Sequence, residues 1–405
     1  MKRPRVAVFG LFGRTNLGNE ATLAAFLDGL RHHLPGAEAV CVGPRDSRVS
    51  AEHGIELIDM EPLRIRHHFW PYEHRYIART VSGVLQMATE AFRVHKATRS
   101  LRGFNALVIP GTGVLDDFGQ GPLDLPSHLL RWCRAAKRAA LPIHMLSVGA
   151  EPVASAKIRR ILGAATALCD YRSFRDLDSR MSAGDYGVHT ASDLLFPDLA
   201  FSLPPSALPP APTVRWPPRT VGLGVMGYAG WNQKGPKSER IYQEYLGKLD
   251  GFTKWLLDRG HTVRLLTGDT RADRRPLEDL LASNRSLTLA HRLIAEPIAT
   301  LDDLLRQIAQ TDIVVGTRFH NVLLALLLER PAISISYSKK NDALLNEFGL
   351  APYCQPVETF EIGRLIAQFE QLSGSTPNIA RIRHQNLTFR AHLTAQYEHI
   401  FPQWL

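Results

Sequence analysis

The sequence has few cysteines and no long hydrophobic segment. Its four cysteines, Cys41, Cys133, Cys169 and Cys354, lie far apart, and no two of them form a C-x-x-C pair. This spacing argues against a zinc site and against a disulfide framework, so we expect reduced thiols in the core. The longest uninterrupted apolar run is Val322–Leu328, whereas a membrane span needs about 20 residues. We therefore expect a soluble protein.

Acidic residues are also in deficit, with 39 Asp and Glu against 48 Lys and Arg and a net charge of +9. Such an excess predicts an anionic partner, which is a phosphorylated substrate, a lipid surface or nucleic acid, and charge alone does not choose among them. Basic residues precede the first apolar run, but Arg14 interrupts that run before any cleavage-site pattern. A secretory signal is therefore not expected, and the cytoplasm is the expected compartment.

Proline is concentrated in one place. Seven of the fifteen residues in Pro204–Pro218 are proline, and neither a helix nor a central strand persists through such a segment. A chain of 405 residues with 45% apolar content forms two cores. The prediction is an N-terminal Rossmann-like domain (1–203), a linker (204–218), a C-terminal Rossmann-like domain (219–375) and a helical segment (376–405).

Strand and helix patterns alternate on both sides of this linker. The strands expected first are Arg5–Phe12, Ala39–Val42, Ala106–Ile109 and Ile143–Val148, with helices at Leu123–Ala140 and Ala154–Leu168. After the linker we expect strands at Thr220–Met226, Thr262–Thr267, Asp312–Val315 and Ala332–Ser336, with helices at Ser238–Asp258, Pro276–Leu281 and Asn321–Glu329. This alternation predicts an α/β fold with two parallel sheets. Ligands of such sheets bind beyond the carboxyl ends of the strands, so a cleft between the halves is the expected active site.

The first strand leads into the glycine-containing loop "GLFGRTNLGNEA". Its glycine spacings of three and five residues differ from the G-x-G-x-x-G fingerprint, which argues against a dinucleotide cofactor. Asn16 or Asn19 is suited to cap the following helix. The loop is equally suited to bind an anion at the helix N-terminus, and both interpretations stay open.

The segment Asp312–Gly349 contains the most informative cluster of polar residues. A buried strand is expected to end at Gly316 and a helix to begin shortly after it, with Arg318 and His320 between them. Residues two apart in an extended connection point the same way, so a cation and an imidazole would face one spot. The alternative is that both are ordinary loop residues, with the histidine bonded to a backbone carbonyl.

Four segments, in chain order, resemble the polysaccharide pyruvyltransferase family: "GLFGRTNLGNEA", "VIPGTGVLDD", "SFRDLDSRMSAGDYGVHTASDLLFPDLAFSL" and "GTRFHNVLLALLLERPAISISYSKKNDALLNEFGL". The resemblance implies a GT-B-like architecture, in which two Rossmann-like domains face each other across a cleft. The pattern of Arg364–Leu405 predicts helices, and a final helix that crosses back to the first domain is compatible with it. The resemblance also implies transfer of pyruvate from phosphoenolpyruvate, as a ketal, to a sugar of a surface polysaccharide or its lipid-linked precursor. Phosphate is then released.

The resemblance also implies which residues do this. Arg318 and His320 match the family's R-x-H and are the expected catalytic residues. The expected substrate-binding residues are Arg175, Lys339, Tyr337, Asn16, Gly18, Glu20, Gly111 and Gly113. Guanidinium groups hold a carboxylate or phosphate in bidentate fashion, which suits Arg175 and Arg318. A positioned imidazole suits the proton transfer, so no metal and no cofactor beyond the donor substrate are expected.

The sequence departs from the family pattern at two positions. Asn19 stands where the family has an aspartate, and Thr112 stands between Gly111 and Gly113 where the family has a third glycine. The first change puts acid chemistry at that position in doubt, while the second is expected to tighten the loop or to add a hydroxyl donor. Neither change affects R-x-H.

Basic residues gather in Arg64–Arg102, which has eight Lys and Arg against two Glu, with aromatic residues between them. One interpretation is peripheral contact with anionic lipid at the inner face of a membrane. The other is a helix with a solvated basic face. No nucleic-acid-binding motif accompanies the charge, so nucleic acid is not an expected partner.

Two other functions stay open at this point. One is a nucleotide-sugar glycosyltransferase of the GT-B type, in which Arg318 and Lys339 would hold a diphosphate. The other is a non-catalytic relative that binds a glycan or lipid, although the retained R-x-H and Y-x-K motifs argue against it.

Overall fold

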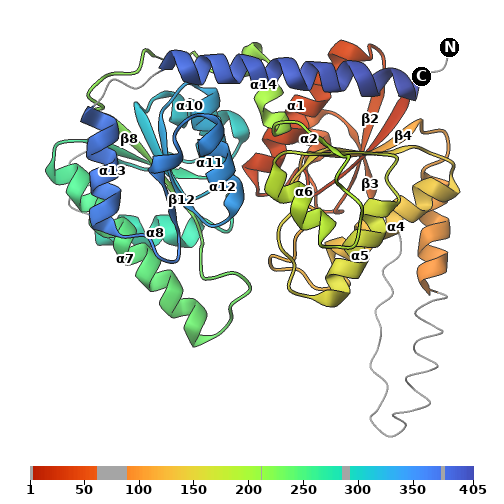
Figure 1. The fold of residues 1–405 in the computed structure, drawn as a ribbon, viewed down its shortest axis with the longest axis horizontal. Coiled ribbons are helices and arrows are strands. Elements are labelled where there is room, and N and C mark those ends of the chain that lie inside the picture. Colours follow the sequence, from red (N-terminus) through yellow and green to blue (C-terminus); the bar gives the residue numbers. More distant parts are fainter. Residues whose placement is uncertain (1–2, 62–88, 211, 285–291, 375–378) are drawn as a thin grey trace, which may run out of the picture. The chain divides into compact units, whose positions relative to one another are not determined.

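The computed structural model describes residues 3–61, 89–210, 212–284, 292–374 and 379–405, and the chain forms two compact units (Figure 1). Unit 1 consists of Met1–Arg14, Leu30–Leu195 and Glu398–Leu405. Unit 2 consists of Thr15–Gly29 and Phe196–Tyr397. Each unit is built around its own parallel sheet and is described by itself.

The sheet of unit 1 has the strand order β3-β2-β1-β4-β5-β6-β7, all parallel. The strands are β1 (Arg5–Phe9), β2 (Glu38–Gly43), β3 (Glu56–Asp59), β4 (Ala106–Pro110), β5 (Ile143–Val148), β6 (Tyr171–Phe174) and β7 (Leu194–Leu195). Every residue of β4 and β5 is buried, as expected when both faces of a parallel sheet are covered. The apolar side chains of these strands form the core of the unit.

Helices connect these strands. They are α1 (Leu17–His33), whose residues Leu17–Gly29 belong to unit 2, α2 (Val49–His53), a helix over residues 89–100, α4 (Leu125–Arg138), α5 (Ala156–Ala167) and α6 (Leu177–Gly184). Side-chain caps fix two of their starts: the Ser155 hydroxyl accepts from the Ile158 N–H, and the Asp176 carboxylate accepts from the Ser179 N–H. The Trp132 indole N–H of α4 donates to the Met60 carbonyl at 2.9 Å, in the core.

The sheet of unit 2 has the order β10-β9-β8-β11-β12-β13, again parallel. Its strands are β8 (Thr220–Val225), β9 (Thr262–Thr267), β10 (Leu293–Ile294), β11 (Ile313–Gly316), β12 (Ala332–Ser336) and β13 (Cys354–Pro356). The central strands β8, β11 and β12 are apolar and buried. Strands β9 and β10 are added on one side of β8, and β11 and the strands that follow it are added on its other side, so the sheet has its topological switch point between β8 and β11. Ligands of open α/β sheets bind at such a point.

The helices of unit 2 are α7 (Pro236–Asp258), α8 (Arg274–Ser283), α10 (Leu301–Ala309), α11 (Phe319–Leu327), α12 (Lys339–Glu347), α13 (Ile362–Gly374) and most of α14 (Ile379–Ile400). Short 3-10 helices lie at η1 (Leu199–Ser202), η2 (Pro205–Ala207) and η3 (Ala351–Tyr353). The ring of Phe201 in η1 packs against Phe348 and Phe389, with centroids 5.8 and 4.9 Å away. These contacts join η1 to α14 within unit 2.

The chain end confirms the expected return to the first domain. Residues Glu398–Leu405, which include the 3-10 helix η4 (Phe401–Trp404), belong to unit 1. There the Trp404 indole N–H donates to Nδ1 of His144 on β5 at 2.8 Å. Burial lowers the pKa of His144 to about 4, so its Nδ1 is an acceptor at neutral pH.

The predicted α/β class with two parallel Rossmann-like sheets is confirmed, and the predicted strands agree with the observed ones to within a few residues. The domain boundaries stay a prediction, and Thr15–Gly29, placed in domain 1–203, belongs to unit 2. Three cysteines are buried and Cys354 is half-buried, all as free thiols. Among the described residues, no helix combines the length and apolar character that crossing a membrane requires.

Candidate active site

The loop after β11 positions the R-x-H motif. The strand ends at Gly316, Thr317 is buried, and Arg318 has extended backbone angles and forms the N-cap of α11. The connection is shorter than predicted, because α11 begins at Phe319 and His320 lies in its first turn. The two side chains therefore have different partners instead of pointing the same way.

Arg318 forms a buried ion pair with Asp273, next to the start of α8. Its Nε lies 3.2 and 3.1 Å from the two carboxylate oxygens, and its Nη2 lies 2.5 Å from Oδ1. Asp273 is fully buried and also accepts the N–H groups of Gly227, Gly268 and Asp269, at 3.0, 3.0 and 2.8 Å. One carboxylate thus fixes the arginine to the loops that follow β8 and β9.

Burial alone would lower the pKa of Arg318, but the charge and hydrogen bonds of Asp273 outweigh it and raise that pKa above its ordinary value. The guanidinium therefore stays charged. Sequence reasoning missed Asp273, although the segment "TGDTRAD" directly follows a predicted strand and ends in this residue. An acid at the carboxyl end of a neighbouring strand was the available signal.

His320 lies between the opening loop and Asp198. Its ring packs directly against the backbone of Gly18, where an added Cβ would lie only 2.0 Å from Nδ1. On the other side, its Nε2 lies 3.7 Å from Oδ2 of the buried Asp198. Asp198 is the N-cap of η1, since Oδ1 accepts from the Ala200 N–H. Its second oxygen faces the imidazole, which the sequence did not indicate.

The opening loop is hydrogen-bonded to the end of β9 within unit 2. The Leu17 N–H donates to the Gly268 carbonyl, and the Thr270 N–H donates to the Thr15 carbonyl, both at 2.9 Å. Asn16 is the capping residue: its Oδ1 accepts from Gly18 N–H at 3.0 Å. Its carbonyl accepts from Asn19 and Glu20, and Glu20 is buried in the first turn of α1. The structure thus brings Asn16, Gly18 and Glu20 into one unit with Arg318 and His320.

A buried amide follows His320. Asn321 is fully buried, and neither its Oδ1 nor its Nδ2 makes a hydrogen bond with a residue that the structure describes. It lies against the backbone of Gly224 and Gly268, where an added Cβ would come within 2.8 Å of the amide. The N-terminus of α11 therefore presents backbone N–H groups and a polar side chain at the carboxyl ends of β8, β9 and β11, an arrangement that favours an anion.

Of the two predicted residues after β12, Tyr337 lies near Arg318 and Lys339 is exposed. Tyr337 is half-buried and lies close enough to Arg318 to raise the pKa of the arginine. Lys339, the predicted ligand, is exposed at the first position of α12. Its neighbour Lys340 instead lies over the rings of Tyr337 and Phe319, with its Nζ 4.4 and 5.9 Å from their centroids.

The other predicted substrate-binding residues lie in unit 1. The guanidinium of Arg175 packs on Gly149, where a Cβ would be 2.3 Å from Nη2, and its Nε lies 3.5 Å from an Asp176 oxygen. Gly111 follows β4 with a φ of 39°, and Gly113 is two residues further on. Between them, Thr112 is buried and its hydroxyl makes no hydrogen bond with a described residue. All of them lie at the carboxyl edge of the first sheet.

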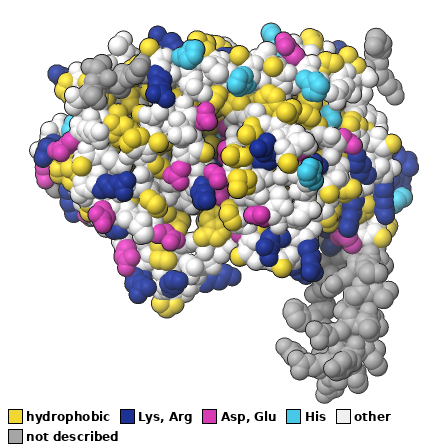
Figure 2. Space-filling view, viewed as in Figure 1, with side chains coloured by type: hydrophobic (Ala, Val, Ile, Leu, Met, Phe, Trp, Pro, Cys, Tyr) yellow, Lys and Arg dark blue, Asp and Glu magenta, His cyan; other side chains and the backbone are white. Residues whose placement is uncertain are grey.

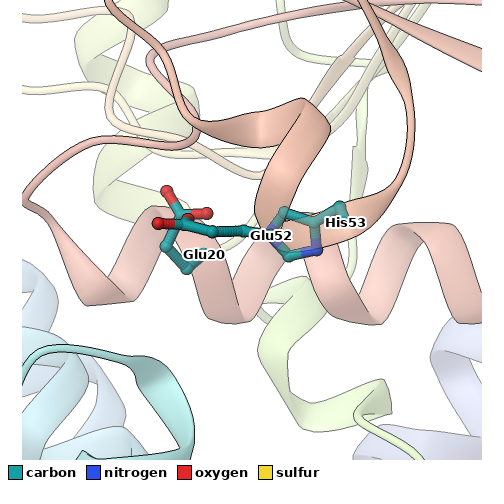
Figure 3. A group of neighbouring side chains, drawn as sticks. All are labelled: Glu20, Glu52 and His53. Atoms are coloured by element: carbon teal, nitrogen blue, oxygen red, sulfur yellow. The ribbon is translucent and has the colours of Figure 1, made fainter.

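Two further expectations concern metals and surface charge. Figure 3 shows Glu20 from α1 and Glu52 and His53 from α2. Because Glu20 belongs to unit 2 and the other two to unit 1, we assign no site to them. On the face in Figure 2, Lys and Arg are interspersed with Asp and Glu. Most of the basic segment Arg64–Arg102 lies outside the described residues.

Solved structures similar to this chain define its fold class. A putative UDP-N-acetylglucosamine 2-epimerase from Listeria monocytogenes matches with a TM-score of 0.58 and 8% identity, over 98% of each chain. Anabaena Alr3699/HepE, solved in complex with UDP and glucose, matches with a TM-score of 0.55 and 11% identity, over 97% of this chain and 95% of the other. At such low identity these neighbours show the fold alone, which is the predicted GT-B-like arrangement of two Rossmann-like domains in one chain.

The family follows from the sequence. The model of the polysaccharide pyruvyl transferase family matches residues 16–339, so the chain belongs to this family and is a pyruvyltransferase. Amylovoran biosynthesis protein AmsJ of Erwinia amylovora is 21% identical over 303 residues, which are 71% of this chain and 69% of that protein. The expected class of enzyme, acting in polysaccharide biosynthesis with a saccharide acceptor, is confirmed at this level.

Proposed function

We propose that this enzyme transfers pyruvate from phosphoenolpyruvate to a sugar of a surface polysaccharide, or of its lipid-linked precursor, as a ketal with release of phosphate. The observation that supports this most directly is that Arg318 and His320 both lie at the N-terminus of α11, each with a buried carboxylate partner. A fixed cation and an imidazole at one helix end suit a donor that is an anion and accepts a proton.

Arg318 is proposed to bind the donor. Its ion pair with Asp273 fixes the guanidinium plane, and the N–H groups of the first turn of α11 add positive potential beside it. Phosphoenolpyruvate carries a carboxylate and a phosphate, and such groups are held well by an arginine whose orientation is already set. The same group stabilises the negative charge of the leaving phosphate, so we propose a reaction without metal or cofactor.

His320 is proposed to be the acid–base group. Ketal formation adds a proton to the methylene carbon of the donor and creates an oxocarbenium-like centre at the neighbouring carbon. One sugar hydroxyl adds to this centre, phosphate leaves, and a second hydroxyl closes the ketal; each hydroxyl gives up its proton. The carboxylate of Asp198 lies 3.7 Å from Nε2 of His320, and the contact with Gly18 fixes the ring.

Phosphate release tests the reaction. Purified enzyme with phosphoenolpyruvate and a panel of glycan acceptors, free and lipid-linked, is expected to release inorganic phosphate only when both substrates are present. His320→Ala is expected to lower turnover by about 10²- to 10⁴-fold while phosphoenolpyruvate still binds. Arg318→Ala is expected to weaken that binding. Unchanged turnover in His320→Ala would remove the histidine from the mechanism.

A nucleotide-sugar glycosyltransferase activity is the outcome that would replace this proposal. Calorimetry distinguishes the two, because tight binding of uridine or guanosine diphosphate without binding of phosphoenolpyruvate would favour the glycosyltransferase. Arg175, Lys339, Gly111 and Gly113 stay predicted substrate-binding residues, to be tested by the same titrations. Cytoplasmic location with peripheral contact of Arg64–Arg102 at the membrane is part of the proposal and is tested by sedimentation with anionic vesicles.

A further inference from the structure

A polar cavity lies in unit 2 at the opposite edge of the sheet from Arg318. It has a volume of about 210 Å³ and is lined by residues at the amino ends of the strands, including Thr220 of β8, Thr262 of β9 and Asp312 before β11. Because a water molecule takes about 30 Å³ in the liquid, this cavity has room for a compact ligand of a few heavy atoms. None of its lining residues takes part in the site described above.

Arg330 lines this cavity and is 2% exposed. Its Nη2 donates to the carbonyls of Pro212 and Ala309, at 2.7 and 2.9 Å. Its Nε makes no hydrogen bond, and its guanidinium forms no ion pair, with any residue that the structure describes. Arginines are almost never fully buried without a charged partner, so the electrostatics of this position are incomplete.

The neighbouring carboxylates are committed to other groups. Both oxygens of Asp312 accept backbone N–H groups, from Arg215, Arg219 and Thr220, each at 2.9 Å. Glu329, next to Arg330 in the chain, forms an ion pair with Arg383 at 2.6 Å. Burial therefore outweighs the attraction of these two acids and lowers the pKa of Arg330.

Two more arginines line the cavity. Arg264 is largely buried and contacts Gln307 at 2.5 Å and Glu296 at 3.2 Å, while Arg215 is exposed. Threonine side chains, from Thr213 and Thr262, complete the lining with hydroxyl donors. The lining thus holds three cations against the single carboxylate of Asp312, which already accepts three hydrogen bonds.

We propose that this cavity is a binding site for a compact anion of the size and charge of inorganic phosphate, with Arg330 as its buried counter-charge. Guanidinium and hydroxyl donors are the groups that hold such anions in proteins. The site is separate from the proposed donor site, and the inference does not depend on the pyruvyl-transfer chemistry. It assigns the enzyme an anion site outside the proposed donor site.

Calorimetric titration of the full chain with inorganic phosphate tests this. The wild type and Arg318→Ala are expected to bind phosphate at the cavity, and Arg330→Gln is expected to weaken that binding by at least about tenfold, the loss of one charge-assisted contact. Arg259→Gln is the matched control, because this exposed arginine pairs with Glu370 outside the cavity and its removal is expected to leave phosphate binding unchanged.

A second variant keeps the proposal falsifiable if Arg330→Gln does not fold. The double variant Arg215→Gln/Arg264→Gln retains the buried arginine and is expected to weaken phosphate binding several-fold. In the wild type, saturating phosphate is expected to raise the melting temperature, since a ligand bound only by the folded state stabilises it. Absence of phosphate binding in Arg318→Ala, or full binding in the cavity variants, would overturn the proposal.

Discussion

Two arginines that flank α11 have opposite surroundings: Arg318 is half-buried and Arg330 is buried. At the carboxyl end of the strand, Arg318 pairs with a carboxylate that also accepts three backbone N–H groups. At the far end of the helix, Arg330 has two neutral carbonyls and a cavity. Burial acts on both, yet the pKa of Arg318 is raised and that of Arg330 is lowered. Burial acts to lower the pKa in both cases, and only at Arg318 do the charge and hydrogen bonds of a carboxylate outweigh it.

His144 in unit 1 shows a third arrangement for a buried basic group. It is 2% exposed, and burial lowers its pKa to about 4, so the imidazole is neutral and accepts from Trp404. Arginine cannot respond in this way at ordinary pH, because its pKa is too high. The three residues show three outcomes for a basic group in the protein interior. Arg318 is paired with a carboxylate, Arg330 has no ion pair with a described residue, and His144 is neutral.

Among the changes considered, removal of Asp273 is expected to have the largest effect on stability, because it removes the carboxylate that distinguishes the surroundings of Arg318 from those of Arg330. Asp273→Ala is expected to lower the free energy of unfolding by about 3–5 kcal/mol, because it leaves the Arg318 charge buried without a partner. The double variant Asp273→Ala/Arg318→Ala is expected to recover part of that loss. Denaturant unfolding of both variants measures the difference. Equal losses in the single and double variants would contradict the view that Arg318 is the group that Asp273 compensates.

Acid is expected to destabilise the folded protein through protonation of His144. Its pKa is lower in the folded chain, about 4, than the ordinary value of 6.5, so folded protein binds the proton less readily. The resulting stabilisation is complete above pH 6.5 and is lost as the pH falls toward 4, by about 3 kcal/mol in total.

Unfolding measurements between pH 4 and 7 test this. His144→Phe is expected to flatten the profile by that amount, whereas replacement of the exposed His95 by glutamine is the control and should leave it unchanged. A profile identical in wild type and His144→Phe would show that other groups carry the acid sensitivity.

The smallest effect on stability is expected at Gly18, where activity is the sensitive measure. Gly18→Ala places a methyl group 2.0 Å from Nδ1 of His320, so the ring must move away from its position near Asp198. We expect a fall in kcat of about tenfold or more, in line with the loss of a positioned acid–base group, with the melting temperature nearly unchanged.

Gly247→Ala is the matched control for Gly18→Ala. Gly247 lies within α7, and an added Cβ there meets nothing within 4 Å. Its replacement should leave kcat unchanged and stabilise the helix slightly. Full activity in Gly18→Ala would mean that the ring contact does not position His320.

The sequence predicted what depends on short-range pattern. The buried strands around Val314 and Ile333 were recognisable because both faces of a parallel sheet are covered, which leaves continuous apolar runs. Arg318 and His320 were recognisable because they closely follow such a strand in the sequence. Their partners were not, since Asp273 lies 45 residues from Arg318 in the chain and only the fold brings them together.

Asp198 and Lys340 show two other limits. The local role of Asp198 as a helix cap was predictable. The position of its second carboxylate oxygen beside His320 was not, because the two residues lie far apart in the sequence. For the adjacent pair Lys339 and Lys340, the sequence favoured the first. Lys339 stays a prediction. The contact of Lys340 with the Tyr337 ring was not predicted, because the direction of a side chain at a helix start depends on backbone angles that a motif does not encode.

The hydrogen bonds between the opening loop and the end of β9 have a consequence for synthesis. The partners Leu17 and Gly268, and Thr15 and Thr270, leave the ribosome far apart in time, because more than half of the chain separates them. Unit 2 therefore gains the segment Thr15–Gly29 only after β9 has been made, and this late closure of a long loop is slow for entropic reasons. His320, which is made after β9, therefore finds the surface that holds its ring only once the segment Thr15–Gly29 has joined unit 2.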